Sequence, residues 1–206
     1  MNPTIVICTV NSPTVSVLLE SISAYGPEYK VVLRKEPPST FGEAFNKAIS
    51  EVFEDADEII MSNDDVVLLP TSISALMEDV RYLQGKHGDK LGLVATYSDN
   101  VRGVQNVRYA NETELKEVRV LSPLLAWISK TAFQSAQFPP INWYSDDVIC
   151  EDLNELGFKN FISRSYVHHV GSQTVGTNYA QLNAAAMSWL EENRPHYIKK
   201  WFQRIK

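Results

Sequence analysis

Apolar runs with β-branched side chains alternate with segments of helical spacing over the first part of the chain. The strands predicted from these runs cover residues 4–10, 30–34 and 58–69, and the helices predicted after them cover 14–25, 41–53 and 71–83. Repeated strand–helix units build a mostly parallel sheet with helices packed on its faces. The sequence therefore predicts an α/β, Rossmann-like fold, in which ligands bind at the carboxyl ends of the strands.

The second half of the chain predicts shorter and less regular elements. Strands are expected at 91–96, 124–129, 161–162 and 166–170, helices from about 130, over 148–156 and from about 180 to the end, and loops or irregular segments at 85–88, 97–118 and 171–176. With 206 residues, 44% of them hydrophobic, the chain is long enough for one substantial core. We therefore expect a single domain over residues 1–206.

The charge balance limits the classes of partner. The 19 basic and 25 acidic residues give a formal net charge of -6, whereas a general nucleic-acid binder needs clustered Lys and Arg. A nucleotide used as a small substrate is compatible with this charge. Cys8 and Cys150 match no metal or redox spacing, and no apolar run is long enough to cross a membrane. These features predict a soluble, intracellular protein that binds no nucleic acid.

Two adjacent carboxylates, Asp64 and Asp65, follow Asn63 within the apolar run at 58–69. Because side chains alternate between the faces of a strand, the two are expected to point in different directions, so that one can bind a metal ion while the other holds a sugar hydroxyl. The alternative is a solvated strand-to-loop turn, for which Asn and Asp are common residues.

A second carboxylate pair, Asp146 and Asp147, precedes the helix predicted at 148–156, and a histidine pair, His168 and His169, lies in the last predicted strand. The aspartates would supply such a site with an acid–base group, or they cap the helix, which is a common role for Asp. Only one of the two histidines can face a given side of a strand, and a lone histidine is often satisfied by a backbone partner.

The order of these motifs resembles the GT-A-fold glycosyltransferases, specifically the large inverting family two and its small phage, viral and bacterial relatives. The matching motifs are Thr9-Val10-Asn11-Ser12, Gly42-Glu43-Ala44-Phe45-Asn46-Lys47-Ala48, Asn63-Asp64-Asp65, Trp143-Tyr144-Ser145-Asp146-Asp147 and His169-Val170-Gly171-Ser172-Gln173-Thr174. The resemblance covers most of the chain. It implies a GT-A domain with a nucleotide-sugar-binding half at 1–95, an acceptor and catalytic half at 96–180 and a C-terminal helix at 181–206.

The resemblance implies a divalent cation, Mn²⁺ or Mg²⁺, bound by Asp65 and His169, with His168 as the alternative to His169. The cation would bridge the donor diphosphate and neutralise charge on the leaving group. Asp64 would face the ribose or the donor sugar. The first position of the family's usual Asp-x-Asp motif is Asn63 here, a departure that removes one charge.

The resemblance further implies that Asp147, beside Asp146, is the base that deprotonates the acceptor hydroxyl. Contacts to the donor nucleotide are implied at the ends of the first strands and on the second helix, by Thr9, Asn11, Ser12, Arg34 and Asn46. The second strand departs from the family because its usual terminal Asp is missing. Arg34 therefore contacts either the donor or only solvent.

Aromatic residues and the C-terminal tail bear on the acceptor. Trp127, Trp143 and Tyr144 are expected either to stack on an acceptor sugar or to belong to the core. The basic and aromatic tail at 194–206 predicts a helix that packs on the body or, at most, contacts an anionic membrane peripherally. The acceptor is expected to be a glycan or a lipid-linked molecule.

The sequence thus predicts a metal-dependent, hexosyltransferase-type enzyme that moves a sugar from a nucleotide diphosphate sugar, with a UDP-sugar favoured, to an acceptor hydroxyl with inversion. One alternative is a noncatalytic module that binds sugar nucleotides or glycans. Another is a nucleotidyltransferase, although Asn11-Ser12-Pro13-Thr14 lacks the Gly-rich loop of that class. The expected location is the cytoplasm of a bacterium or of a virus-infected host cell.

Overall fold

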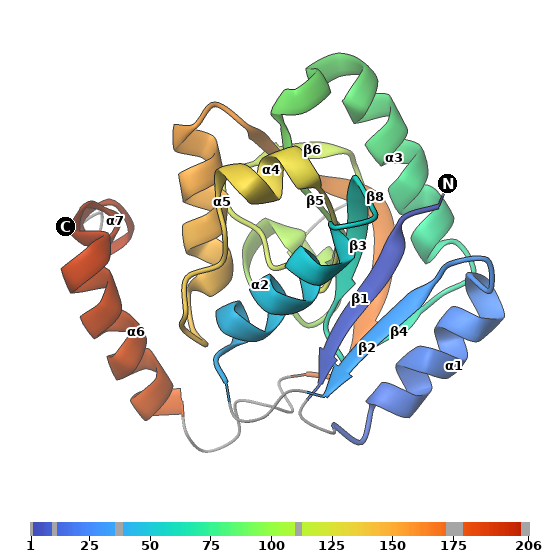
Figure 1. Ribbon diagram of the computed structural model, residues 1–206, viewed down its shortest axis with the longest axis horizontal. Helices are drawn as coiled ribbons and strands as arrows, with labels where there is room; N and C mark the ends of the chain where they lie inside the picture. The colour runs from blue at the N-terminus through green and yellow to red at the C-terminus, as the bar shows by residue number, and fades with distance from the viewer. Residues whose placement is uncertain (1, 10–11, 36–38, 110–112, 172–178, 203–206) are drawn as a thin grey trace.

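The computed structural model describes residues 2–9, 12–35, 39–109, 113–171 and 179–202, which fold around one sheet (Figure 1). Its strands are β1 (Thr4–Thr9), β2 (Val31–Lys35), β3 (Glu58–Ser62), β4 (Val66–Leu68), β5 (Leu91–Ser98), β6 (Lys116–Val118), β7 (Leu125–Ser129) and β8 (Lys159–His169). Their order is β2-β1-β3-β7-β5-β8-β4, and β6 also pairs with β8. β1 is parallel to β2 and to β3, and β5 is parallel to β8. β7 lies between β3 and β5 and is antiparallel to both. All the strands named here except β7 therefore run in the same direction. The mostly parallel sheet is confirmed.

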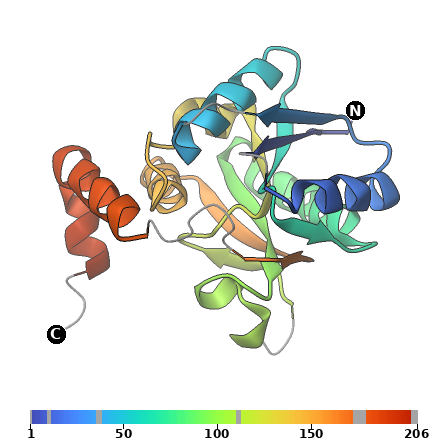
Figure 2. The same ribbon diagram turned by 90° about the horizontal axis from the view of Figure 1, so that it is seen from below.

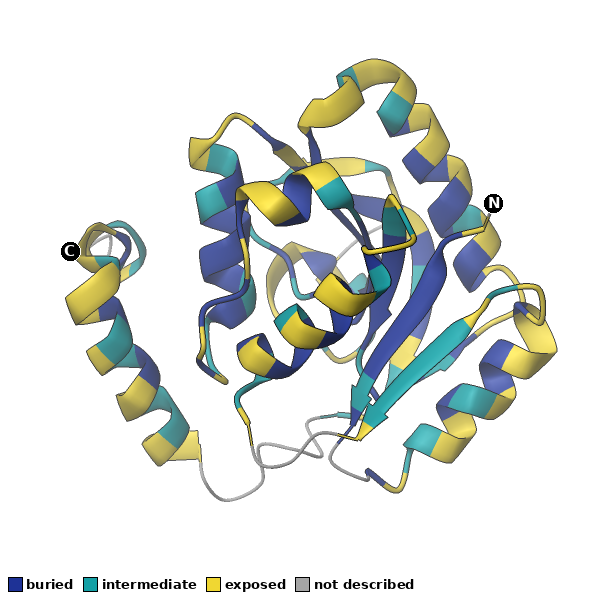
Figure 3. Ribbon diagram, viewed as in Figure 1, coloured by how far each residue is buried: buried dark blue, intermediate teal, exposed yellow. Residues whose placement is uncertain are grey.

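Helices cover both faces of the sheet (Figures 1 and 2). They are α1 (Val15–Tyr25), α2 (Phe41–Val52), α3 (Ser72–His87), α4 (Lys130–Ser135), α5 (Ser145–Glu155), α6 (Tyr179–Asn193) and α7 (Pro195–Phe202). Alternation along β1 divides its side chains between two cores, since Val6 packs with residues of α2, α4 and α5, whereas Ile5 and Ile7 pack with residues of α1 and α3. Figure 3 shows β1 buried between these layers and the edge strand β2 half-buried.

The strand predicted over 58–69 is two strands in the structure. β3 pairs with β1 and β7 near the middle of the sheet, whereas β4 pairs with β8 at its edge. The chain leaves the sheet at Asn63, whose backbone N–H donates to the Leu124 carbonyl at 2.9 Å, and Asp64 and Asp65 form the turn between the strands. Alternation along one strand was therefore the wrong reason to expect the two carboxylates to point apart.

Several other boundaries differ from those predicted. α3 continues through the loop expected at 85–88 and is followed by a 3₁₀ turn at Gly88–Lys90, and the strands expected at 161–162 and 166–170 are one strand, β8. The irregular segment at 97–118 contains short 3₁₀ turns at Gly103–Gln105 and Val107–Tyr109 and ends in β6. Of the loop at 171–176, only Gly171 is among the described residues.

The C-terminal helix is divided at Pro195. Proline lacks the backbone N–H needed inside a helix but fits the first turn, so α6 ends before it and α7 begins with it. None of the helices in the described ranges is long and apolar enough to span a membrane.

The start of α2 is held tightly against the segment that precedes α5. A Cβ atom added to Gly42 would lie 1.8 Å from the Pro139 carbonyl oxygen, so only glycine fits this contact. The same end of α2 has a capping box, in which the Thr40 hydroxyl accepts from the Glu43 N–H at 3.2 Å and the Glu43 carboxylate accepts from the Thr40 N–H at 2.9 Å. These contacts fix the loops that surround the carboxyl ends of β1 and β3.

Candidate active site

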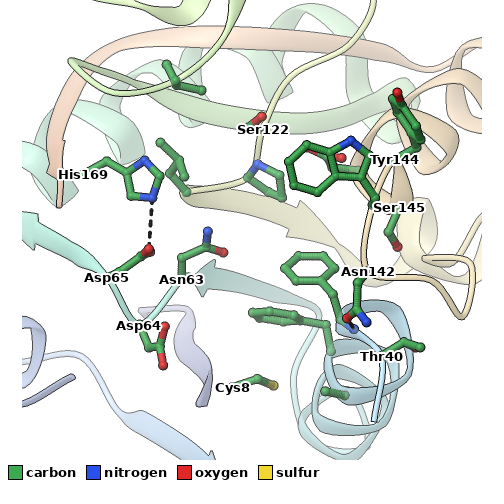
Figure 4. Close-up of a pocket in the computed structure, with 18 of the residues that line it drawn as sticks. Cys8, Thr40, Asn63, Asp64, Asp65, Ser122, Asn142, Tyr144, Ser145 and His169 are labelled. Carbon is green, nitrogen blue, oxygen red and sulfur yellow. Dashed lines mark hydrogen bonds and ion pairs between the residues drawn. The ribbon is translucent and has the colours of Figure 1, made fainter. Parts of the chain in front are cut away.

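A cavity of about 580 Å³ lies at the carboxyl ends of β1 and β3 (Figure 4). Its walls come from the end of β1, the start of α2, the turn between β3 and β4, the segment after β5, the first turn of α5 and the end of β8. Of the residues predicted from the sequence, the lining includes Thr9, Asn63, Asp64, Asp65, Asp146 and His169. Segments from the whole length of the chain therefore meet at one polar cavity.

The Asp64 side chain points toward β1. The Thr9 hydroxyl donates to Asp64 Oδ2 at 2.5 Å, and the Thr14 hydroxyl donates to the Asp64 carbonyl oxygen at 2.9 Å. Burial raises the pKa of the Asp64 carboxyl above its ordinary value, the Thr9 hydrogen bond works against this, and the charge of Asp65 adds to it. Asp64 is thus a fixed acceptor beside the end of β1.

The Asp65 side chain points the other way, toward β8 (Figure 4). Its Oδ2 lies 3.1 Å from His169 Nε2, and the register Val66↔His169 between β4 and β8 brings the two residues together. Its other oxygen, Oδ1, is buried and has no hydrogen-bond partner within the described part of the chain. A buried carboxylate oxygen without a partner carries a desolvation cost that a bound cation would remove.

The hydrogen bonds of His169 fix the role of each ring nitrogen. A carbonyl oxygen only accepts, so Nδ1, which is 2.5 Å from the Asn100 carbonyl, carries the proton of the neutral ring. In the neutral ring, Nε2 then points its lone pair at Asp65 Oδ2. Because both atoms are acceptors, their contact is favourable only when a proton or a cation lies between them. Burial lowers the pKa of His169, but the hydrogen bonds to Asp65 and Asn100 outweigh it and the pKa is raised.

His168 lies on the opposite side of β8 and outside the cavity lining. Its side chain is half-exposed, and its Nδ1 is 2.7 Å from Asp99 Oδ2. Asp99 also accepts from the backbone N–H of His169 at 3.1 Å, so one carboxylate steadies the end of β8. Of the two alternatives, His169 is the histidine whose side chain reaches Asp65.

The second carboxylate pair lies in the first turn of α5 and is joined to Arg102. Arg102 Nη2 donates to Asp147 Oδ2 at 2.7 Å and to Asp146 Oδ2 at 3.2 Å. Asp146 and Arg102 line the cavity, whereas the Asp147 side chain is 8% exposed and lies outside the lining. Burial and then the charge of Asp146 raise the pKa of Asp147 to about 7, although Arg102 works against this.

Several residues predicted as donor contacts lie elsewhere. Arg34 is half-exposed and pairs with Glu51 at 2.5 Å. The side-chain amide of Asn46 donates to the Phe138 carbonyl and accepts from the Phe138 N–H. Ser12 is buried outside the lining, with its hydroxyl 2.5 Å from the Thr14 hydroxyl. Both side chains contact α2 or its neighbours rather than the cavity, so the donor roles predicted for Arg34 and Asn46 stay predictions. Asn11 lies outside the described residues.

The aromatic residues divide between the two positions expected from the sequence, the cavity and the core. Trp143 and Tyr144 line the cavity, but Trp127 is 1% exposed in the sheet and donates from Nε1 to Glu58 Oε2 at 2.9 Å.

Sequence reasoning missed Arg102, which lies in a stretch without periodicity. It also missed Asn142, whose Oδ1 accepts from the N–H of Phe41 at 2.8 Å, because this contact crosses 101 residues.

Comparison of the sequence with family models and with curated proteins finds no match. Solved structures do match the fold. Protein A197 from STIV is 13% identical with a TM-score of 0.56, over 79% of this chain and 81% of that one. S. aureus TarS 1–349 in complex with UDP-GlcNAc is 14% identical with a TM-score of 0.57, over 84% of this chain and 59% of that one.

GalNAc-T7 with UDP, GalNAc and Mn²⁺ is 12% identical with a TM-score of 0.64, and the match covers 84% of this chain and 44% of that one. This chain therefore spans most of A197 but about half the length of the other two. At such low identity the likeness concerns architecture alone. The chain has the GT-A fold of the glycosyltransferases, as the order of its motifs predicted.

Proposed function

We propose that this protein is a metal-dependent glycosyltransferase that moves a sugar from a UDP-sugar to an acceptor hydroxyl with inversion. The observation that carries the proposal is the buried Oδ1 of Asp65, which has no hydrogen-bond partner among the described residues. The Asp65 carboxylate also lies beside His169 Nε2, at the carboxyl ends of the strands in a GT-A fold. Matching structures contain UDP, UDP-GlcNAc, or UDP with GalNAc and Mn²⁺, which supports this class of donor.

At the donor end, Asp65 and His169 would hold Mn²⁺ or Mg²⁺. A carboxylate oxygen and an imidazole nitrogen suit such a cation, and no group of three or more metal-binding side chains occurs within the described ranges, so donor phosphate oxygens would complete its coordination. When bound, the cation would neutralise charge that develops on the departing diphosphate. Asp64, held by Thr9, would accept a hydrogen bond from a ribose or sugar hydroxyl.

At the acceptor end, we assign the general base to Asp146 rather than to Asp147. The base must reach the proton that it removes, and of the two carboxylates Asp146 lines the cavity. Arg102 would hold Asp146 in position and also bind Asp147 behind it. Deprotonation of the acceptor oxygen as it attacks the donor sugar from the face opposite the diphosphate would invert the sugar carbon.

The test is nucleotide release from UDP-, GDP- and dTDP-sugars with and without Mn²⁺. Metal-dependent release from UDP-sugars by the native protein, abolished in Asp65→Ala, is the expected result. Asp146→Asn should lose transfer by at least about a hundredfold and still bind UDP with Mn²⁺, whereas Asp147→Asn should lose less. A protein that binds none of these nucleotides with or without metal would refute the proposal, and binding without release would favour a noncatalytic module.

A further inference from the structure

The end of the cavity away from Asp65 and His169 is walled by aromatic rings. Figure 4 shows Tyr144 and Ser145 on the side of the cavity opposite His169. The adjoining Trp143 also lines the cavity, as does Leu182 of α6. Asp146, the carboxylate proposed as the base, follows directly in the chain. Flat apolar groups and a carboxylate are therefore close together at this end.

The C-terminal helices complete this wall through ring contacts. The rings of Trp143 and Tyr179 meet edge to face with centroids 4.9 Å apart, and Leu182 follows Tyr179 on the same side of α6. The Tyr144 ring lies 5.9 Å from the ring centroids of both Trp201 and Phe202 in α7. The wall thus joins the segment before α5 to two helices that follow β8 in the chain.

Two acidic residues of α5, of which Glu151 is buried, hold this wall in place. Glu151 is 1% exposed and accepts from Lys200 Nζ at 2.9 Å and from Trp201 Nε1 at 3.1 Å. Asp152 accepts from the Tyr197 hydroxyl at 2.7 Å. Since α5 also carries Asp146 in its first turn, the helix that presents the carboxylate anchors the wall beside it.

The backbone of Tyr144 is adapted to this arrangement. Its φ of 64° lies in the left-handed region, which non-glycine residues rarely adopt and which persists only where the surrounding contacts enforce it. Tyr144 is the N-cap of α5 and stands between Trp143 and Ser145, and all three residues line the cavity. Strained conformations of this kind concentrate at ligand sites.

We propose that this end of the cavity is a saccharide-binding subsite, so that the acceptor is a glycan, an inference that rests on the proposed function. A pyranose ring has an apolar face that packs on Trp143 or Tyr144 and hydroxyls that reach the Asp146 carboxylate. A lipid chain would cover this carboxylate without bonding it, which is costly.

The experiment is saturation-transfer NMR with three free disaccharides, chitobiose, cellobiose and maltose, on the native protein saturated with UDP and Mn²⁺. At least one disaccharide should receive saturation from the protein, and Trp143→Ala should weaken its binding by tenfold or more. Tyr179→Ala, which alters a half-exposed ring, should weaken it less, and Tyr109→Ala, an exposed tyrosine outside the cavity lining, should leave it unchanged.

Donor binding measured in the same samples separates the two proposals. Two results would overturn the subsite and leave the proposed function standing, provided that UDP and Mn²⁺ bind normally. In the first, none of the disaccharides binds. In the second, a disaccharide binds equally well to the native protein, Trp143→Ala and Tyr179→Ala. Disaccharide binding that depends on Trp143 in a protein that binds no nucleotide supports the subsite and refutes the transferase. Competition of UDP itself with the disaccharide at Trp143 assigns this end to the donor and overturns the subsite.

Discussion

His169 Nε2 lies 3.1 Å from Asp65 Oδ2 although 104 residues separate them in the sequence. The contact depends on β4 and β8, whose antiparallel pairing aligns Val66 with His169 and Val67 with His168. Because alternate residues of β8 face opposite sides, this register determines which of two neighbouring imidazoles meets the carboxylate. The relationship leads to a direct comparison of the two histidines.

Replacing His169 by alanine should weaken the binding of UDP in the presence of Mn²⁺ by about tenfold or more, since an imidazole would be lost from the proposed metal site. His168→Ala is the matched control, because His168 is half-exposed and bonds Asp99 instead. Isothermal titration with UDP and Mn²⁺ measures both variants. Equal affinities for the two would remove His169 from the metal site.

The pH dependence of stability should change in Asp147→Asn. The pKa of Asp147 is about 7 in the folded protein against an ordinary 3.8, so the stabilisation from its protonated form is complete below about pH 4 and is lost as the pH rises through 7. The free energy of unfolding of the native protein, relative to that of the variant, should therefore fall over this range, by at most about 1.4 kcal/mol per pH unit.

Urea denaturation at intervals from pH 4 to 7 measures this difference. Asp89→Asn, which changes an exposed carboxylate in the turn after α3, should give a profile parallel to that of the native protein. A parallel profile for Asp147→Asn as well would show that Asp147 titrates as in the unfolded chain.

Two glycine-to-alanine substitutions should have opposite effects on stability. Gly42→Ala should lower the free energy of unfolding by about 3 kcal/mol, because its Cβ would lie 1.8 Å from a backbone oxygen that cannot move without shifting the loop before α5. A Cβ added to Gly85, on an exposed turn of α3, would have no atom within 4 Å. Gly85→Ala should therefore raise the free energy of unfolding by about 0.5–1 kcal/mol. Chemical denaturation of both variants tests the pair.

Glu151→Ala should loosen α7. The substitution leaves Lys200 and Trp201 without their buried acceptor, and we expect a loss of about 2–3 kcal/mol in unfolding free energy. Glu155→Ala, which alters a half-exposed carboxylate 3.9 Å from Lys200, should cost less than about 1 kcal/mol. Amide hydrogen exchange should become faster in α7 for Glu151→Ala, and unchanged exchange there would refute the anchoring role.

The alternating first half of the fold was predictable because its signals are local. The apolar runs and caps at β1, α1, β2 and α2 agree with the structure to within about one residue, since hydrophobic periodicity and turn residues act over a few positions. The break between β3 and β4 was not predictable in this way. Leu68 and Val167 pair across the sheet, and nothing near Asn63 in the sequence records that partner.

The candidate site was predictable in its residue types but less so in its geometry. Asp64, Asp65 and His169 meet at the cavity as expected, because the carboxyl ends of the strands converge there. The sequence could not show that Asp146 lines the cavity while Asp147 is buried, or that Arg102, from a segment without a sequence signal, bonds both. Asn46 has the residue type expected at a donor site, yet its amide is used by the Phe138 backbone.

The position of β7 between β3 and β5 has a consequence for how the chain folds. Residues 1–95 and 96–180, which sequence reasoning separated into two halves, share one sheet, and the later half supplies the strand that joins β3 to β5. During synthesis, β3 and β5 are both made before β7 (Leu125–Ser129), so the edges at which they pair with β7 are unpaired until that strand is made. Unpaired edges of this kind invite pairing with other chains, so a chain that lacks β7 would be prone to aggregate through β3 and β5.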